Sequence, residues 1–258
     1  MHLSCPLLAA AALVVGVNLA AAKPPVGDLS PPKPAQFAKP RLVEPTLHLS
    51  PSGSTAGRVA LTLDACGGQT DRRILDALVE NRIPATIFVT GIWLKHNADA
   101  FAVLRTHPEL FEIEDHGARH VPAVDAPATI YGIKTAGSPA AVTTEVEKGA
   151  EELQAAGGAA PHWFRGATAK YDEPAIALIG KLGYHVAGYS LNADGGSLLG
   201  AAVTEKRVAK AKDGDVIIAH INQPTHAAGA GLVKGLLELK ARGVTFVRLQ
   251  DTEEVAGS

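Results

Sequence analysis

The sequence predicts an α/β fold built as a barrel of parallel strands with helices outside. Apolar segments rich in β-branched residues, such as 59–63 and 85–89, alternate with segments of helical periodicity, such as 70–81. This order implies a parallel sheet with helices packed on it. Polar side chains also follow the strand ends, where barrels collect their chemistry. An open doubly wound sheet is the alternative, but no phosphate-binding glycine spacing follows the first strand.

Local signals mark where the elements begin and end. Thr70 or Asp71 supplies an N-cap to the first helix, and Gly183 and Gly243 stop two later helices. We expect strands at 59–63, 85–89, 111–113, 162–164, 184–189, 216–219 and 244–249. We expect helices at 70–81, 99–107, 143–156, 174–182, 204–212 and 231–242. Residues 121–142 form a long loop, which is either a lid or substrate loop or a passive insertion.

The N-terminal residues predict an export signal, at 1–22. An uncharged apolar run from Leu7 to Leu19 precedes three alanines, which are typical of a cleavage site. The run is too short for a transmembrane helix, which needs roughly 20 apolar residues. An uncleaved anchor is the alternative. Residues 23–57 are rich in proline and indicate a linker or wrapping arm, so we expect the folded domain at 58–258.

The composition limits the classes of function. The chain of 258 residues is 47% hydrophobic, which suffices for one sizeable core rather than two domains. A net charge of -2 gives no basic surface for nucleic acid or anionic lipid. Once the signal is cleaved, Cys66 is the remaining cysteine, so no internal disulfide forms. We therefore expect a periplasmic or secreted protein without a nucleic-acid partner and without stable membrane insertion after cleavage.

His116 and His120 are the most informative pair of residues. Histidines at i and i+4 share one face of a helical turn and can bind one metal ion. A solvated loop with incidental histidines is the alternative, but the pair follows the strand at 111–113, directly after two acidic residues. Three protein ligands plus water would form the open metal site that a hydrolase needs.

Two further titratable residues follow predicted strands. Asp64 comes directly after 59–63 and before a glycine pair, where it is placed to act as a general base; a turn-forming aspartate is the alternative. His220 follows 216–219 and is placed to protonate a leaving amine. These residues and the histidine pair therefore predict a base, an acid and a metal site on one rim.

The ordered motifs resemble those of the polysaccharide deacetylases, carbohydrate esterase family four. The similar segments are 59–64, 83–91, His116 with His120, 163–165, 189–194 and 215–220. The resemblance covers about Arg58 to Asp251, so it identifies 58–258 as the catalytic domain. It implies a distorted (β/α) barrel and Zn²⁺ or a similar divalent metal.

The same resemblance implies a role for each matching residue. Asp64 would be the catalytic base, and Arg165 would orient it. His220 would be the general acid, with Asp194 as its partner. His116 and His120 would be metal ligands. The implied reaction is removal of N-acetyl groups from an amino-sugar glycan, such as peptidoglycan or a chitin-like polymer.

The first motif departs from the family pattern. Ala65 stands where the family has a metal-binding aspartate, so a third ligand must come from elsewhere. We prefer Asp71 slightly over Cys66, although Asp71 is also a suitable helix cap and a free cysteine is commonly buried. In the third motif, residues 166–168 replace the family's prolines, so the groove wall there is expected to differ.

Ala65 also leaves room for other classes of function. The first is a metal-free glycan-binding pseudoenzyme on the same fold. A weaker alternative is an exported metal-binding scaffold without glycan chemistry. The retained Asp64, His116, His120 and His220 favour the enzyme, because a pure binding module needs none of them.

Overall fold

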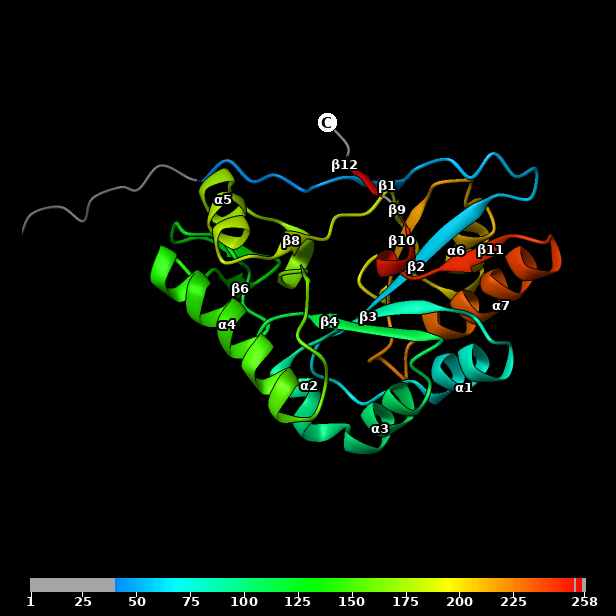
Figure 1. Cartoon of the computed structure of the whole chain (residues 1–258), viewed down its shortest axis with the longest axis horizontal. Coiled ribbons are helices and arrows are strands. Elements are labelled where there is room, and N and C mark those ends of the chain that lie inside the picture. Colours follow the sequence, from blue (N-terminus) through cyan, green and yellow to red (C-terminus); the bar gives the residue numbers. More distant parts are fainter. Residues whose placement is uncertain (1–39, 253, 257–258) are drawn as a thin grey trace, which may run out of the picture. The chain divides into compact units, whose positions relative to one another are not determined.

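The computed structural model describes residues 40–252 and 254–256 (Figure 1). The predicted export signal at 1–22 and residues 23–39 of the predicted arm lie outside the described residues. None of the helices in the described ranges has the length and apolar character needed to cross a membrane. The predicted α/β fold with a distorted parallel barrel is confirmed.

The central sheet contains eight strands, all paired in parallel. Its order is β8-β7-β4-β3-β2-β10-β9, and β11 pairs with the first residues of β2. The strands are β2 (Arg58–Ala65), β3 (Ala85–Val89), β4 (Phe111–Asp115), β7 (Trp163–Phe164), β8 (His185–Val186), β9 (Leu191–Asn192), β10 (Val216–His220) and β11 (Thr245–Val247). The long β2 lies at the centre of the sheet, and every residue from Val59 to Ala65 is buried, as expected for a strand covered on both faces.

One chain segment, 185–192, closes the barrel. Its start, β8, pairs with β7, and its end, β9, pairs with β10. Between them, Ala187 N–H donates to Phe164 O and Ser190 N–H to Val216 O. Residues 187–190 thus connect the two edges as irregular chain, which is why the barrel is distorted.

Helices surround the sheet (Figure 1). They are α1 (Arg72–Glu80), α2 (Gly91–His96), α3 (Ala98–Thr106), α4 (Pro139–Ala155), α5 (Glu173–Lys181), α6 (Ala201–Val208) and α7 (Ala228–Ala241). Two short 3-10 turns, Ala167–Ala169 and Leu249–Asp251, complete the helical elements of the described residues.

Strand alternation separates two buried layers. Leu61, Leu63 and Ile87 point toward the helices, whereas Ala60 and Phe88 belong to a second cluster with Trp163. Leu47 and Leu49 of β1 (Leu47–Leu49) are buried in that second cluster, and β1 pairs with β12 (Glu254–Ala256). Packed residues in the structure therefore begin before Arg58.

The short elements α2, β9 and a hairpin of β5 (Thr129–Ile130) and β6 (Ile133–Lys134) were not predicted. The helix α2 has six residues and the hairpin strands have two each. Elements of this length contain too few residues to show a hydrophobic period.

Candidate active site

A pocket of about 680 Å³ lies at the carboxyl ends of the central strands. Asp64 ends β2 in it, His116 follows β4, and His220 ends β10. Parallel strands bring their carboxyl ends to one edge, so residues far apart in sequence meet there. The structure thus brings together the strand-end residues that the sequence singled out.

Arg165, directly after β7, holds Asp64. Its Nη1 donates to Asp64 Oδ1 at 3.0 Å and to Thr62 Oγ1 at 2.8 Å. Its Nε and Nη2 donate to the carbonyls of Ala187 and Gly188. Because Arg165 is fully buried, these contacts fix the Asp64 carboxylate in one orientation.

The charge state of Asp64 suits a proton acceptor. Burial by itself raises the pKa of this carboxyl, but the positive charges of Arg165, His116 and His220 outweigh burial and lower it. Asp64 is therefore a carboxylate at neutral pH, with Oδ2 left free of Arg165.

His220 is paired with Asp194. Asp194 Oδ2 accepts from the His220 backbone N–H at 2.7 Å, and Oδ1 accepts from His220 Nδ1 at 3.0 Å. Burial lowers the pKa of His220, but its hydrogen bonds to Asp194 and Cys66 dominate and raise it well above the usual value. The hydrogen bond to Asp194 thus favours the protonated imidazole, which can donate a proton through Nε2.

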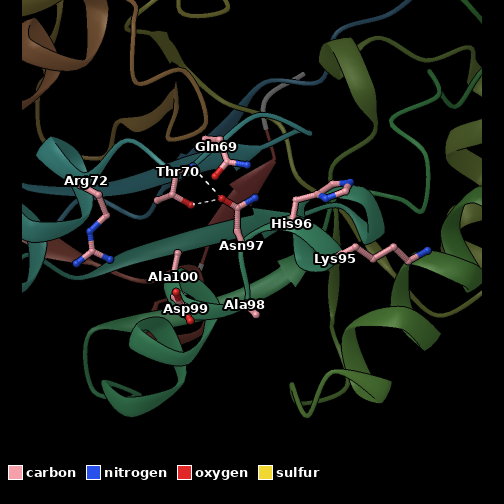
Figure 2. Close-up of a pocket in the computed structure, with 9 residues that line it drawn as sticks. All are labelled: Gln69, Thr70, Arg72, Lys95, His96, Asn97, Ala98, Asp99 and Ala100. Atoms are coloured by element: carbon pink, nitrogen blue, oxygen red, sulfur yellow. Dashed lines mark hydrogen bonds between the residues drawn. The ribbon is translucent and has the colours of Figure 1, made fainter.

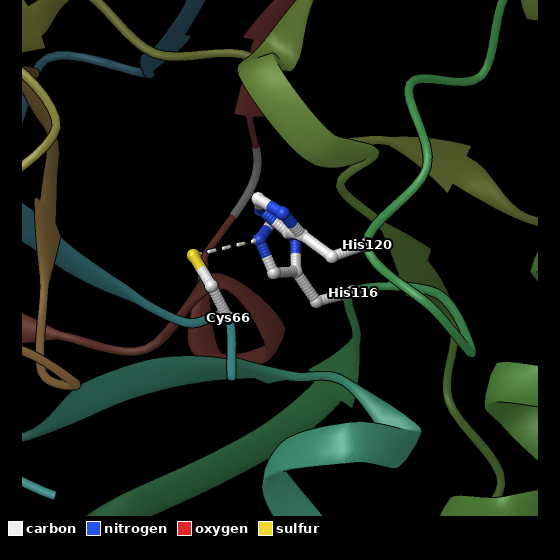
Figure 3. Close-up of side chains that lie close together, drawn as sticks. All are labelled: Cys66, His116 and His120. Atoms are coloured by element: carbon white, nitrogen blue, oxygen red, sulfur yellow. Dashed lines mark hydrogen bonds between the residues drawn. The ribbon is translucent and has the colours of Figure 1, made fainter. Parts of the chain in front are cut away.

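Cys66, His116 and His120 form a cluster of possible metal ligands (Figure 3). One ligand atom from each lies within 4.8 Å of the others. Cys66 Sγ is 3.6 Å from His116 Nε2, and the two imidazole rings are 5.1 Å apart. His116 Nδ1 donates to Arg165 O, which leaves Nε2 facing the cluster.

The Cys66 sulfur is surrounded by imidazoles. Burial raises the pKa of its thiol, but hydrogen bonds to His116, His120 and His220 lower the pKa well below the ordinary value. The surrounding imidazoles thus favour the thiolate, which is the form that binds metal ions.

The expectation that His116 and His120 share a helical turn is wrong. Residues 116–120 are irregular, with a positive φ of 84° at Gly117 and 58° at His120. Glu145 of α4 holds this loop, because its Oε1 accepts from the backbone N–H groups of Arg119 at 2.9 Å and Val121 at 3.0 Å. A Cβ at position 117 would lie 2.5 Å from that carboxylate, so the close approach requires glycine.

The structure does not bring Asp71 to the histidines, which corrects the preference for it over Cys66. Asp71 is the N-cap of α1, and both its oxygens accept hydrogen bonds from Arg73. Extended chain alternates its side chains, so Asp64 and Cys66 face the pocket while Ala65 is buried among core residues. Counting two residues on from Asp64 would have pointed to Cys66.

Two residues that sequence reasoning missed position the Cys66 loop. Thr90 Oγ1 donates to Cys66 O, and Thr90 also caps α2. Asn97 Oδ1 accepts from the N–H and hydroxyl of Thr70, at 2.9 and 2.8 Å (Figure 2), while its Nδ2 donates to Gly68 O. A second, polar concavity of about 510 Å³ lies beside this loop.

The long loop at 121–142 also reaches the pocket. Its hairpin contributes Tyr131 and Ile133 to the lining. Thr168, in the segment that departs from the family's third motif, and Ala169 after it line the pocket with positive φ values of 70° and 52°. Glu44 lines it from the predicted arm.

Comparison with known proteins assigns the class. Residues 52–187 match the family model described as polysaccharide deacetylase. This chain belongs to the polysaccharide deacetylase family. No curated protein sequence matches the chain.

Solved structures show the same fold. A family 4 carbohydrate esterase from Streptomyces lividans is 19% identical, with 74% of this chain and 91% of that chain covered and a TM-score of 0.58. A family 4 pseudoenzyme from Bacillus anthracis is 19% identical, with 79% and 69% covered and a TM-score of 0.61. The peptidoglycan deacetylase PdaC from Bacillus subtilis, determined as a variant, is 20% identical, with 76% and 89% covered and a TM-score of 0.62.

Proposed function

We propose that this chain is an exported, metal-dependent hydrolase that removes N-acetyl groups from an amino-sugar glycan, giving acetate and a free amine. The observation that carries the proposal is the arrangement of side chains in one pocket. Asp64, bound by Arg165, and His220, bound by Asp194, line the same pocket as the cluster of Cys66, His116 and His120. A base, an acid and a metal-binding group are what amide hydrolysis requires.

The donor set fits a divalent metal ion. One thiolate sulfur and two imidazole nitrogens suit Zn²⁺, and three protein ligands leave a position open, as in catalytic sites. We therefore place Zn²⁺ or a similar divalent ion on Cys66, His116 and His120. Such an ion, when bound, polarises a carbonyl oxygen and lowers the pKa of water.

The protein residues then divide the proton transfers. Asp64 takes a proton from the attacking water through Oδ2, since Arg165 binds Oδ1. The water oxygen adds to the acetyl carbon. His220 donates its proton to the nitrogen as the carbon–nitrogen bond breaks, and Asp194 stabilises the imidazolium until that moment. The acetyl group leaves as acetate and the sugar retains a free amine.

Family and location suggest the substrate. The Bacillus subtilis relative is named as a peptidoglycan deacetylase. A periplasmic or secreted enzyme would meet peptidoglycan or a chitin-like glycan. Acetylated xylan, which requires ester cleavage, is the alternative substrate.

A second candidate is a metal-free glycan-binding pseudoenzyme. Ala65 favours it, because alanine cannot coordinate a metal ion, and one structural neighbour is described as a pseudoenzyme. Cys66 opposes it, since its sulfur lies where a third ligand is needed.

Metal content and acetate release per chain test the proposal. The unaltered protein, supplied with zinc, should bind about one ion per chain. His116→Ala and Cys66→Ala should lose the ion and the activity, and Asp71→Ala should retain both. If the unaltered protein binds no zinc but still binds glycan, the pseudoenzyme replaces the deacetylase. Zinc binding without acetate release from any acetylated glycan leaves only the metal-binding scaffold.

A further inference from the structure

Two exposed apolar side chains line the catalytic pocket. Tyr131 is 76% exposed and Leu198 is 79% exposed, the highest values among the large hydrophobic residues described. Both line the 680 Å³ pocket, whereas Leu42, Val203 and Leu237, the other exposed large hydrophobics described, do not. Apolar side chains left exposed at the mouth of a pocket that contains a possible active site mark a surface that a ligand covers.

The backbone at Tyr131 is strained for an aromatic residue. Tyr131 and Gly132 connect β5 to β6 with positive φ values of 50° and 83°. A turn with two left-handed residues favours asparagine followed by glycine, because asparagine tolerates positive φ better than a bulky side chain does. The exposed ring contributes little packing in return, and strain of this kind concentrates at functional positions.

Contacts from other segments fix the Tyr131 ring at the pocket. Lys170 Nζ lies 5.3 Å from the ring centroid, and Lys170 also pairs with Glu44 at 3.5 Å. Glu44 itself lines the pocket, so the hairpin tip is tied to the pocket wall. A ring held in this way loses little freedom on binding.

Leu198 lies on an anchored loop that follows Asp194. Leu199 N–H donates to Asp194 O, and His226 Nδ1 donates to Ser197 O. The backbone on each side of Leu198 is thus fixed although its side chain is exposed. A fixed backbone with a projecting apolar side chain is suited to contact a rigid ligand.

We propose that Tyr131 and Leu198 are specificity-determining residues of this chain, which bind the apolar faces of the sugar rings next to the reacting sugar. A pyranose ring presents a face of C–H groups that packs on an aromatic or aliphatic side chain. The reacting acetamide lies at the polar floor near Asp64 and His220, and its neighbours extend over the rim. This inference rests on the proposed function, because the glycan that it describes is the substrate.

The test is calorimetric binding of the linear N-acetylglucosamine tetramer and of the monosaccharide to the Asp64→Asn protein, in which turnover is too slow to interfere. Adding Tyr131→Asn should raise the tetramer Kd by about tenfold and leave the monosaccharide unaffected. Tyr131→Phe should stay within about twofold. The Asn-Gly turn suits the hairpin, so Tm should stay the same or rise, which separates lost binding from misfolding.

Leu198→Asn and its matched control Leu237→Asn complete the test. The first should raise the tetramer Kd several-fold and the second should not. An unchanged tetramer Kd in Tyr131→Asn, or equal binding of the two sugars, overturns the inference.

Acetate release by the Tyr131→Asn variant in the otherwise unaltered, zinc-loaded protein separates this inference from the proposed function. Release with an unchanged KM means that the deacetylase stands and the inference fails. Tetramer binding that depends on Tyr131, without acetate release by the unaltered protein, means that the inference stands and the deacetylase fails. A tetramer that does not bind overturns this inference, and absence of acetate release from every acetylated glycan, peptidoglycan included, overturns the proposed function as well.

Discussion

Two groups of residues in the same pocket are held in place in different ways. Asp64 lies near the end of β2 and His116 directly follows β4; they are 4% and 1% exposed, and both contact Arg165, through its guanidinium and its carbonyl respectively. Cys66 and His120 lie on loops and are only partly buried. Their positions are set through the backbone, by Thr90 at Cys66 O and by Glu145 at the two residues flanking His120.

The difference separates side chains that the fold holds directly from side chains that are positioned through the backbone of a loop. The strand-end groups have side chains held by ion pairs and hydrogen bonds, so their charge states are defined by the fold. Cys66 and His120 each depend on one residue outside the pocket that holds the loop backbone, Thr90 and Glu145 respectively. Changes at the strand ends should therefore affect the reaction or the stability strongly. Changes at Thr90 or Glu145 should affect metal binding through the loops that these residues hold.

The largest effect is expected at Asp64. Asp64→Asn keeps the shape and an acceptor for Arg165 but removes the basic oxygen. Acetate release should fall by about 10³-fold, the range of general base catalysis, while zinc content stays unchanged. The measurement is kcat at equal metal loading. Unchanged turnover would falsify the assignment of Asp64 as the base.

The strand that carries His116 should show an effect of pH on stability. Glu114 is 3% exposed, and burial, with the charge of Glu112, raises its pKa from 4.5 to about 8. Between these values the folded protein holds a proton that the unfolded chain has lost, so stability falls as pH rises. Glu114→Gln removes this loss of unfolding free energy, which is on the order of a few kcal/mol by pH 8.

Urea unfolding at about pH 5 and pH 8 measures this effect. The variant should show a flatter pH dependence than the unaltered protein, and the exposed control Glu109→Gln should not. A Glu114→Gln protein that loses as much stability as the unaltered protein toward pH 8 would rule out a protonated Glu114.

The next largest effect is expected at Glu145, which holds the loop that carries His120. Glu145→Ala frees the backbone N–H groups on both sides of His120, so the zinc affinity should fall roughly 10- to 100-fold, as for other residues that orient ligands. Competition with a chromophoric chelator measures it. Glu147→Ala, on the exposed side of the same helix, is the matched control. Equal affinities in the two variants would mean that His120 does not depend on Glu145.

The smallest effect is expected at Asp71. Asp71→Ala removes the cap of α1 and should cost about 1 kcal/mol of unfolding free energy, with zinc affinity unchanged. Chemical denaturation and zinc titration of the same sample measure both quantities. Loss of zinc at unchanged stability would return Asp71 to the ligand set.

The difference between strand-end residues and loop residues also explains which parts of the site the sequence predicted. Asp64, His116 and His220 could be placed by counting to the ends of strands, because apolar β-rich segments are readable from sequence. The conformation of the loops could not be predicted from the sequence. A left-handed Gly117 replaced the expected helical turn, and the pairing of Asp71 with Arg73 depends on local geometry that no period reveals. The export signal at 1–22 and the role of residues 23–39 as a linker or arm stay predictions.

The closing segment at 185–192 has a consequence for the order of folding. Arg165 binds the carbonyls of Ala187 and Gly188 with the same guanidinium that holds Asp64. The segment docks only when β7 and β10 are both in place, which requires contacts between distant parts of the chain, and such contacts form slowly. During refolding, catalytic competence should therefore return with the last kinetic phase rather than with the bulk of the secondary structure.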